Sequence, residues 1–236
     1  MICKFWPALC ATTLLATYLG SIALAADNQL TDEEARAGWQ LLFNGRDHAG
    51  WKCNNGKPIA TPVEDGSLLP FKSGGYIIIY DRKQFSDFFL KCDVKWEAEH
   101  CNSGIFFRVE DPENPVHTGF EVQVMSGNEV GKHQFGAIYD LVPTQVNAGK
   151  KTGQWNTVEI TCQGPRIAVR LNGQEVSSIN VDQFDKPGYC PDGEKHKYTL
   201  NGKPRAVKDF ARKGYVGLQD HGQKVWYKNI KLLELP

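Results

Sequence analysis

A carboxylate, an amide and a guanidinium occur on two neighbouring strand-like stretches of the sequence. Residues 119–125 read Gly-Phe-Glu-Val-Gln-Val-Met, so Glu121 and Gln123 alternate with apolar residues. Successive side chains of a strand point to opposite faces, which predicts one polar face holding both. By its parity in residues 102–108, Arg108 joins that face if the two strands are neighbours. Such a face suits a polyhydroxylated ligand, although a solvated outer face with a surface ion pair shows the same alternation.

The composition argues against several classes of partner. The chain has 236 residues with 27 basic and 27 acidic side chains, so its formal charge is zero. No excess of basic residues draws it to nucleic acid or to an anionic membrane. Aromatic residues at 11% and 23 glycines are typical of a β-rich protein with many turns, and a carbohydrate partner is compatible with this.

The first residues have the features of a secretory signal peptide. Lys4 precedes an apolar run over residues 11–24, and Ala23-Leu24-Ala25 supplies a small-x-small cleavage pattern. The run is too short for a stable membrane span. We therefore expect a signal peptide over residues 1–25, one domain over residues 26–236, and export to the periplasm or the extracellular space. A retained N-terminal anchor is the alternative.

Five cysteines remain after residue 25, and an exported protein is permitted disulfides. Because the number is odd, at least one thiol stays free or pairs between chains. Buried free thiols are as compatible with the pattern as a bridge. The five are Cys53, Cys92, Cys101, Cys162 and Cys190.

Short strand-like segments with regular turn signals predict an all-β fold. Residues 30–38 form the one clear helix, where Thr31 and Glu34 match a capping box and Gly38 ends the helix. At least ten strands follow, and Asn172-Gly173 is the strongest hairpin signal. Residues 185–213 lack periodicity and read as a long surface insertion. We expect a two-sheet antiparallel jelly-roll sandwich.

Seven motifs in register resemble the 3-keto-disaccharide hydrolase domain family, long described as a domain of unknown function. The resemblance covers about residues 38–235 and implies a concanavalin A-like, laminin-G-like jelly roll. The motifs are Phe43-Asn44-Gly45-Arg46-Asp47 with Gly50-Trp51, Trp96-Glu97 with residues 102–108, residues 120–124, Gly136-Ala137-Ile138-Tyr139, Trp155-Asn156, Leu171-Asn172-Gly173 and residues 217–222.

The resemblance implies cleavage of glycosides whose C3 hydroxyl has been oxidised to a ketone. The ketone acidifies the C2 hydrogen, so a general base can remove it and the C1 oxygen can leave; water addition then gives net hydrolysis. Glu121 is the first candidate for the base, His221 is the second, and Arg108 is the candidate for stabilising the enolate. The candidate substrate-binding residues are Asn102, Gln123, Gln219, Asp220, Glu97 and Tyr139.

Several alternatives stay open. A conventional glycosidase would pair Glu121 with Glu97 or Asp220 at about 5 to 10 Å across the bond. A non-catalytic, lectin-like carbohydrate-binding module uses the same fold. A divalent cation is compatible with the chemistry, and Asp220-His221 could bind one or could only shape a turn. The sequence sets neither the oligomeric state nor the exact substrate.

Overall fold

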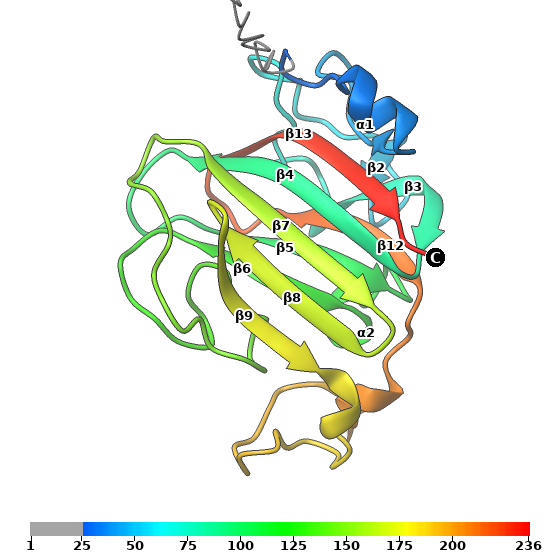
Figure 1. The fold of residues 1–236 in the computed structure, drawn as a ribbon, viewed down its shortest axis with the longest axis vertical. Helices are drawn as coiled ribbons and strands as arrows, with labels where there is room; N and C mark the ends of the chain where they lie inside the picture. Colours follow the sequence, from blue (N-terminus) through cyan, green and yellow to red (C-terminus); the bar gives the residue numbers. More distant parts are fainter. Residues whose placement is uncertain (1–25) are drawn as a thin grey trace, which may run out of the picture.

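Two antiparallel sheets pack face to face in the computed structural model, which describes residues 26–236 (Figure 1). The predicted signal peptide over residues 1–25 lies outside the described residues. Within the described part, no helix is long and apolar enough to cross a membrane. The all-β sandwich predicted from the sequence is confirmed.

The strands of the two sheets interleave along the chain. The six-stranded sheet has the spatial order β1 (Gln40–Leu41), β13 (Val225–Glu234), β4 (Phe88–Trp96), β7 (Asn156–Gln163), β8 (Arg166–Leu171) and β9 (Gln174–Asn180). The five-stranded sheet has the order β2 (Trp51–Cys53), β3 (Ile77–Phe85), β12 (Gly214–Gln219), β5 (Asn102–Val109) and β6 (Phe120–Met125).

Few other regular elements are present in the described part. They are the helices α1 (Asp32–Arg36) and α2 (Pro115–Thr118), the 3-10 turns η1 (Val181–Gln183) and η2 (Val207–Asp209), and the small hairpin of β10 (Thr199–Leu200) with β11 (Lys203–Pro204). The predicted insertion holds β10, β11 and η2, and leaves the sandwich beyond β9 at the lower end of Figure 1.

Alternating side chains fill the space between the sheets. Every second residue of β4, from Phe88 to Trp96, is buried, and the residues between them are half-buried. From the five-stranded sheet, Phe120, Val122 and Val124 point into the same core. This leaves the outer face of the five-stranded sheet to the intervening residues of β6.

The local signals in the sequence are confirmed. Thr31 Oγ1 accepts from Glu34 N at 3.1 Å, while Glu34 Oε2 accepts from Thr31 N at 3.0 Å, which completes the capping box of α1. Asn172 and Gly173 have φ of +51° and +86°, as the tight turn between β8 and β9 requires. All five cysteines of the described part are buried free thiols.

Arg108 is not on the polar face, which corrects the parity argument. Between the pairs Tyr215–Val109 and Gly217–Phe106, β5 advances one residue more than β12, and Arg108 has φ of +49°. This β-bulge breaks the period-two alternation, since an extra residue re-aims the side chains that follow it.

The Arg108 side chain is fully buried and links two turns at the end of the sandwich. Its Nε donates to Ser86 O at 2.9 Å, its Nη1 donates to Gly164 O at 2.9 Å, and its Nη2 pairs with Asp87 Oδ1 at 2.8 Å. Every contact holds the fold together.

Replacing Arg108 by Met should therefore destabilise the protein. The change leaves two backbone carbonyls and the Oδ1 atom of Asp87 without their donor, so we expect the free energy of unfolding to fall by about 2–4 kcal/mol. Urea unfolding measures this. Arg46→Met, at an exposed position, is the control and should stay within about 0.5 kcal/mol of the wild type. Equal midpoints for both variants would contradict a structural role for Arg108.

Candidate functional site

Glu121 is a buried carboxylate on the outer face of the five-stranded sheet. Glu121 is 4% exposed, and its carboxylate makes no hydrogen bond within residues 26–236. Gly104 of the neighbouring β5 makes room for it, because a Cβ at that position would overlap the Glu121 carboxylate. Phe106 lies opposite Glu121 in the register and is itself buried. The carboxylate is therefore buried between these strands without a direct hydrogen-bond partner in the described part.

Burial raises the pKa of Glu121 to about 8, and the positive charge of Lys197 opposes this rise. Desolvation disfavours the charged form of a carboxyl group, whereas a nearby cation favours it. A carboxylate with a pKa in this range is a much stronger base than an ordinary glutamate. Its position therefore suits proton abstraction from carbon.

Two amides flank Gly104 on the same face. Gln123 pairs with Gly104 across β5 and β6, and the pairing of Leu218 with Ile105 places Gln219 on the other side of Gly104. We call Asn102, Glu121, Gln123 and Gln219 the polar face. Its two glutamines are 1% and 4% exposed.

In each glutamine the amide nitrogen donates a hydrogen bond, whereas the amide oxygen accepts none in the described part. Gln123 Nε2 donates to Asn102 Oδ1 at 2.9 Å, and Gln219 Nε2 donates to Tyr76 OH at 2.7 Å. The Oε1 atom of both residues is buried without a partner in the described part. Buried acceptors are normally paired, so these two oxygens and the carboxylate match a ligand that donates hydrogen bonds. Sugar hydroxyl groups are such donors.

Two tyrosines lie close enough to Glu121 to respond to its charge. Burial raises the pKa of Tyr76 to about 12, and Glu121 adds to the rise. The pKa of Tyr139 is raised by burial, by Glu121 and by Asp140. The backbone N–H of Tyr139 donates to the backbone oxygen of Glu121 at 2.9 Å, which fixes the loop that carries Tyr139, between β6 and β7, against β6. Both phenols therefore stay protonated and can donate hydrogen bonds.

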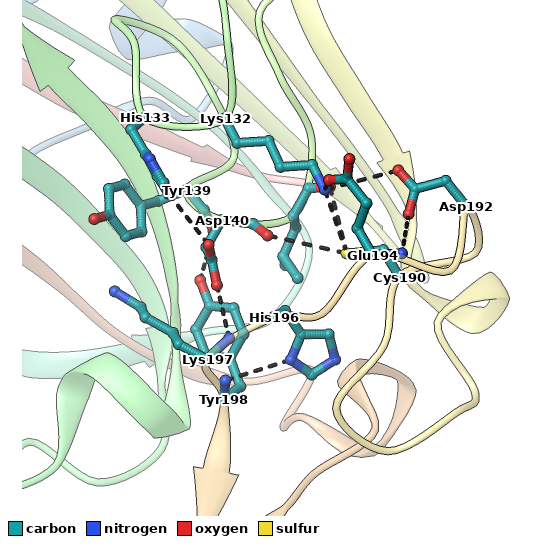
Figure 2. Close-up of polar contacts among 11 residues, drawn as sticks. Lys132, His133, Tyr139, Asp140, Cys190, Asp192, Glu194, His196, Lys197 and Tyr198 are labelled. Atoms are coloured by element: carbon teal, nitrogen blue, oxygen red, sulfur yellow. Dashed lines mark hydrogen bonds and ion pairs between the residues drawn. The ribbon is translucent and has the colours of Figure 1, made fainter.

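Residues 196–199 of the insertion return to this loop, and we call them the wall segment (Figure 2). Lys197 N donates to Asp140 Oδ2 at 2.7 Å, and Tyr198 OH donates to Tyr139 O at 2.6 Å. Lys197 Nζ lies 4.0 Å from the centre of the Tyr139 ring, a cation–π contact. An ammonium group thereby stands beside the polar face.

Three other predicted residues, Glu97, Asp220 and His221, make no hydrogen bond with the Glu121 carboxylate in the described part. Glu97 is exposed beyond the end of β4, in the six-stranded sheet, and so does not face this site. Asp220 accepts from Lys72 N at 2.8 Å and from Gly222 N at 2.9 Å, as a turn-capping carboxylate does. His221 follows Gln219 by two residues in an exposed turn and makes no hydrogen bond in the described part. Its role stays a prediction.

The sequence argument missed Lys197 and Tyr76. Lys197 lies in the insertion, which none of the matched motifs covers, and Tyr76 directly precedes β3 without a motif of its own. The signal available for Lys197 was its place in a basic cluster with His196 in that insertion. Neither residue has a local pattern that predicts a contact with β6.

No group of three His, Cys, Asp or Glu residues lies close enough to hold a metal ion within residues 26–236. The polar face offers one carboxylate and two neutral amide oxygens, fewer charged oxygen ligands than divalent-cation sites in proteins usually provide. These residues do not fit the cation considered from the sequence, and we derive no chemical step through one.

The stability of Glu121→Gln should diverge from that of the wild type as the pH rises. The folded protein holds its Glu121 proton up to about pH 8, whereas an unfolded chain releases it near the ordinary value of 4.5. The wild type therefore loses stability between these values, on the order of 1 kcal/mol per pH unit, and the glutamine variant lacks this loss. Urea unfolding from pH 5 to pH 9 measures the difference. Glu97→Gln is the exposed control, and a difference that does not change with pH would contradict an unpaired carboxyl group at residue 121.

Comparisons with known proteins agree with this architecture. The 3-keto-alpha-glucoside-1,2-lyase-like domain matches residues 38–233. A Bacteroides thetaiotaomicron protein named 3-keto-disaccharide hydrolase is 23% identical over 94% of this chain and 87% of its own length.

Two crystal structures of Parabacteroides distasonis proteins, described as candidate glycosyl hydrolases, are similar in fold and sequence. One has a TM-score of 0.70 and 26% identity over 84% of this chain and 99% of its own. The other has a TM-score of 0.69 and 28% identity over 89% and 100%. These likenesses support a glycoside hydrolase at the level of the family. Because the matched domain spans nearly all of the described residues, the chain belongs to the 3-keto-alpha-glucoside-1,2-lyase-like family.

Proposed function

We propose that this protein is an exported enzyme that cleaves the glycosidic bond of 3-keto-glycosides, with Glu121 as the general base. One observation carries the proposal: a buried carboxylate without a hydrogen-bond partner lies beside the Lys197 ammonium in a chain of this family. Structural carboxylates are usually paired, so an unpaired one in such a setting is a candidate for catalysis.

The first step is removal of the C2 hydrogen as a proton. The C3 carbonyl accepts the electron pair of the broken C–H bond as an enolate, and the Glu121 carboxylate takes the proton. The raised pKa of Glu121 reduces the difference in pKa between the base and the C2–H carbon acid. It also leaves only a minor fraction of Glu121 ionised at pH 7, so the reaction should speed up toward pH 8.

The enolate oxygen needs a positive charge or a hydrogen-bond donor. The Lys197 ammonium and the phenols of Tyr76 and Tyr139 are the groups beside Glu121 that offer these. They take the role first assigned to Arg108. Gln123 and Gln219 suit the remaining hydroxyl groups of the sugar through their free amide oxygens.

Collapse of the enolate then breaks the C1–O bond. The electron pair of that bond leaves with the aglycone oxygen, which takes up a proton, and a C1–C2 double bond remains in the sugar. Addition of water across this double bond gives the same products as hydrolysis. A conventional two-carboxylate route has less support, because Glu97 does not face this site and the Asp220 carboxylate caps a turn.

Product release from a 3-keto-glucoside and from its unoxidised parent tests the proposal. Only the keto sugar should be cleaved, and Glu121→Gln should lower kcat by about 10²–10⁴-fold while sugar affinity largely remains. For the wild type, kcat/KM should rise with pH and level off near pH 8. Cleavage of both sugars would favour the two-carboxylate route. Sugar binding without turnover would favour a lectin-like module.

Lys197→Met should move the pH profile. Removing the ammonium raises the pKa of Glu121 further, so kcat/KM should level off at a higher pH and at a lower value. Lys195→Met changes an exposed lysine two residues away and is the matched control. An unchanged profile in Lys197→Met would show that the ammonium does not act on the base.

A further inference from the structure

Three consecutive backbone N–H groups of the wall segment donate to side chains instead of to a strand. Lys197 N donates to Asp140 Oδ2 at 2.7 Å, Tyr198 N donates to His196 Nδ1 at 3.3 Å, and Thr199 N donates to His117 Nδ1 at 3.1 Å. A backbone N–H can only donate, so both imidazole nitrogens must be unprotonated. Two of the three acceptors are therefore lost when histidine takes up a proton.

The two histidines come from different parts of the chain. His117 belongs to α2, which precedes β6, and is half-buried, whereas His196 opens the wall segment and is 8% exposed. The imidazole rings of both contact the ring of Tyr198, with centroids 6.5 Å and 5.5 Å away. His117 thus links the wall segment to α2, whereas His196 accepts a hydrogen bond within the wall segment itself.

We propose that His117 and His196 are positioning residues whose neutral imidazoles hold the wall segment, and with it Lys197, beside Glu121. The inference rests on the proposed function only for its effect on turnover. The hydrogen bonds themselves can be tested without any substrate.

Burial favours the neutral form of both imidazole rings, and the charged groups around them act in both directions. At His117, burial lowers the pKa and the charge of Lys197 adds to this effect. Arg205 Nη1 donates to the backbone oxygen of His117 at 3.5 Å. Arg205 is itself paired with Glu110 at 3.5 Å.

At His196, burial and Lys132 lower the pKa, while Asp140 opposes them. Tyr198 is uncharged beside both rings, because burial raises its pKa well above the usual value. The hydrogen bonds to both imidazoles are thus complete above about pH 6.5 and are lost as the pH falls through the lower values of the folded state.

Amide hydrogen exchange of the purified protein, followed by NMR and corrected for intrinsic rates, tests the inference. From about pH 7.5 to pH 5 the protection of the Tyr198 and Thr199 amides should fall at least about tenfold. The amides of Val158 and Ile160 in β7 are the reference and should keep theirs. Unchanged protection of Thr199 at pH 5 would overturn the inference.

Asparagine variants separate titration from structure. Asn Oδ1 can replace Nδ1 as an acceptor but does not titrate, so His117→Asn should keep Thr199 protected at pH 5 while Tyr198 still loses protection. His196→Asn should show the opposite pattern. His117→Leu should lose protection of Thr199 already at pH 7.5. Loss of Thr199 protection at pH 5 in His117→Asn, as in the wild type, would contradict the role of the imidazole.

Kinetics at about pH 8 add the readout for positioning. His117→Leu should lower kcat with little change in KM, by no more than the decrease that Lys197→Met causes in a parallel assay, and His117→Asn should restore kcat. If wild-type protein cleaves no keto sugar, the proposed function fails while the exchange result still decides the inference. Full activity of His117→Leu together with normal protection of Thr199 would overturn it.

Discussion

Burying a carboxylate without a partner costs free energy, and the arrangement of the polar face follows from this cost. Gly104 leaves the space that the Glu121 side chain fills, and the buried Phe106 lies opposite Glu121 in the register. The cost is visible as the raised pKa of Glu121. Natural folds tolerate such a conflict mainly where function requires it, because elsewhere a paired or apolar residue would be more stable.

The sandwich and the insertion contribute different things to the site. Strands β5, β6 and β12 place Glu121, Gln123 and Gln219 on a rigid sheet face, where the register sets their spacing. The insertion supplies the cation from a segment in which three consecutive backbone N–H groups donate to side chains. The carboxylate is thus carried by a sheet strand, whereas the cation is carried by a separate segment of the chain.

The polar groups of the site also explain what kind of ligand it can accept. Two buried amide oxygens without partners and a carboxylate require hydrogen-bond donors, while the lysine and the tyrosines supply a charge and donors of their own. In the proposed function, a sugar that carries both hydroxyl groups and a ketone would satisfy the two sets together. This complementarity agrees with the family to which the chain belongs.

Patterns between near neighbours in sequence were sufficient to predict the fold and to place two of the four residues of the polar face, Glu121 and Gln123. The alternation in residues 119–125, the capping box at Thr31 and the Asn172-Gly173 turn are local, so the sequence alone identified a sandwich and put Glu121 and Gln123 on one face. Only the tertiary structure decided the fate of Arg108 and Lys197. The bulge that turns Arg108 away arises from pairing with β12, more than a hundred residues later, and Lys197 meets Tyr139 across about half that separation. Such long-range contacts depend on the arrangement of the whole chain in space, so no local sequence pattern predicts them.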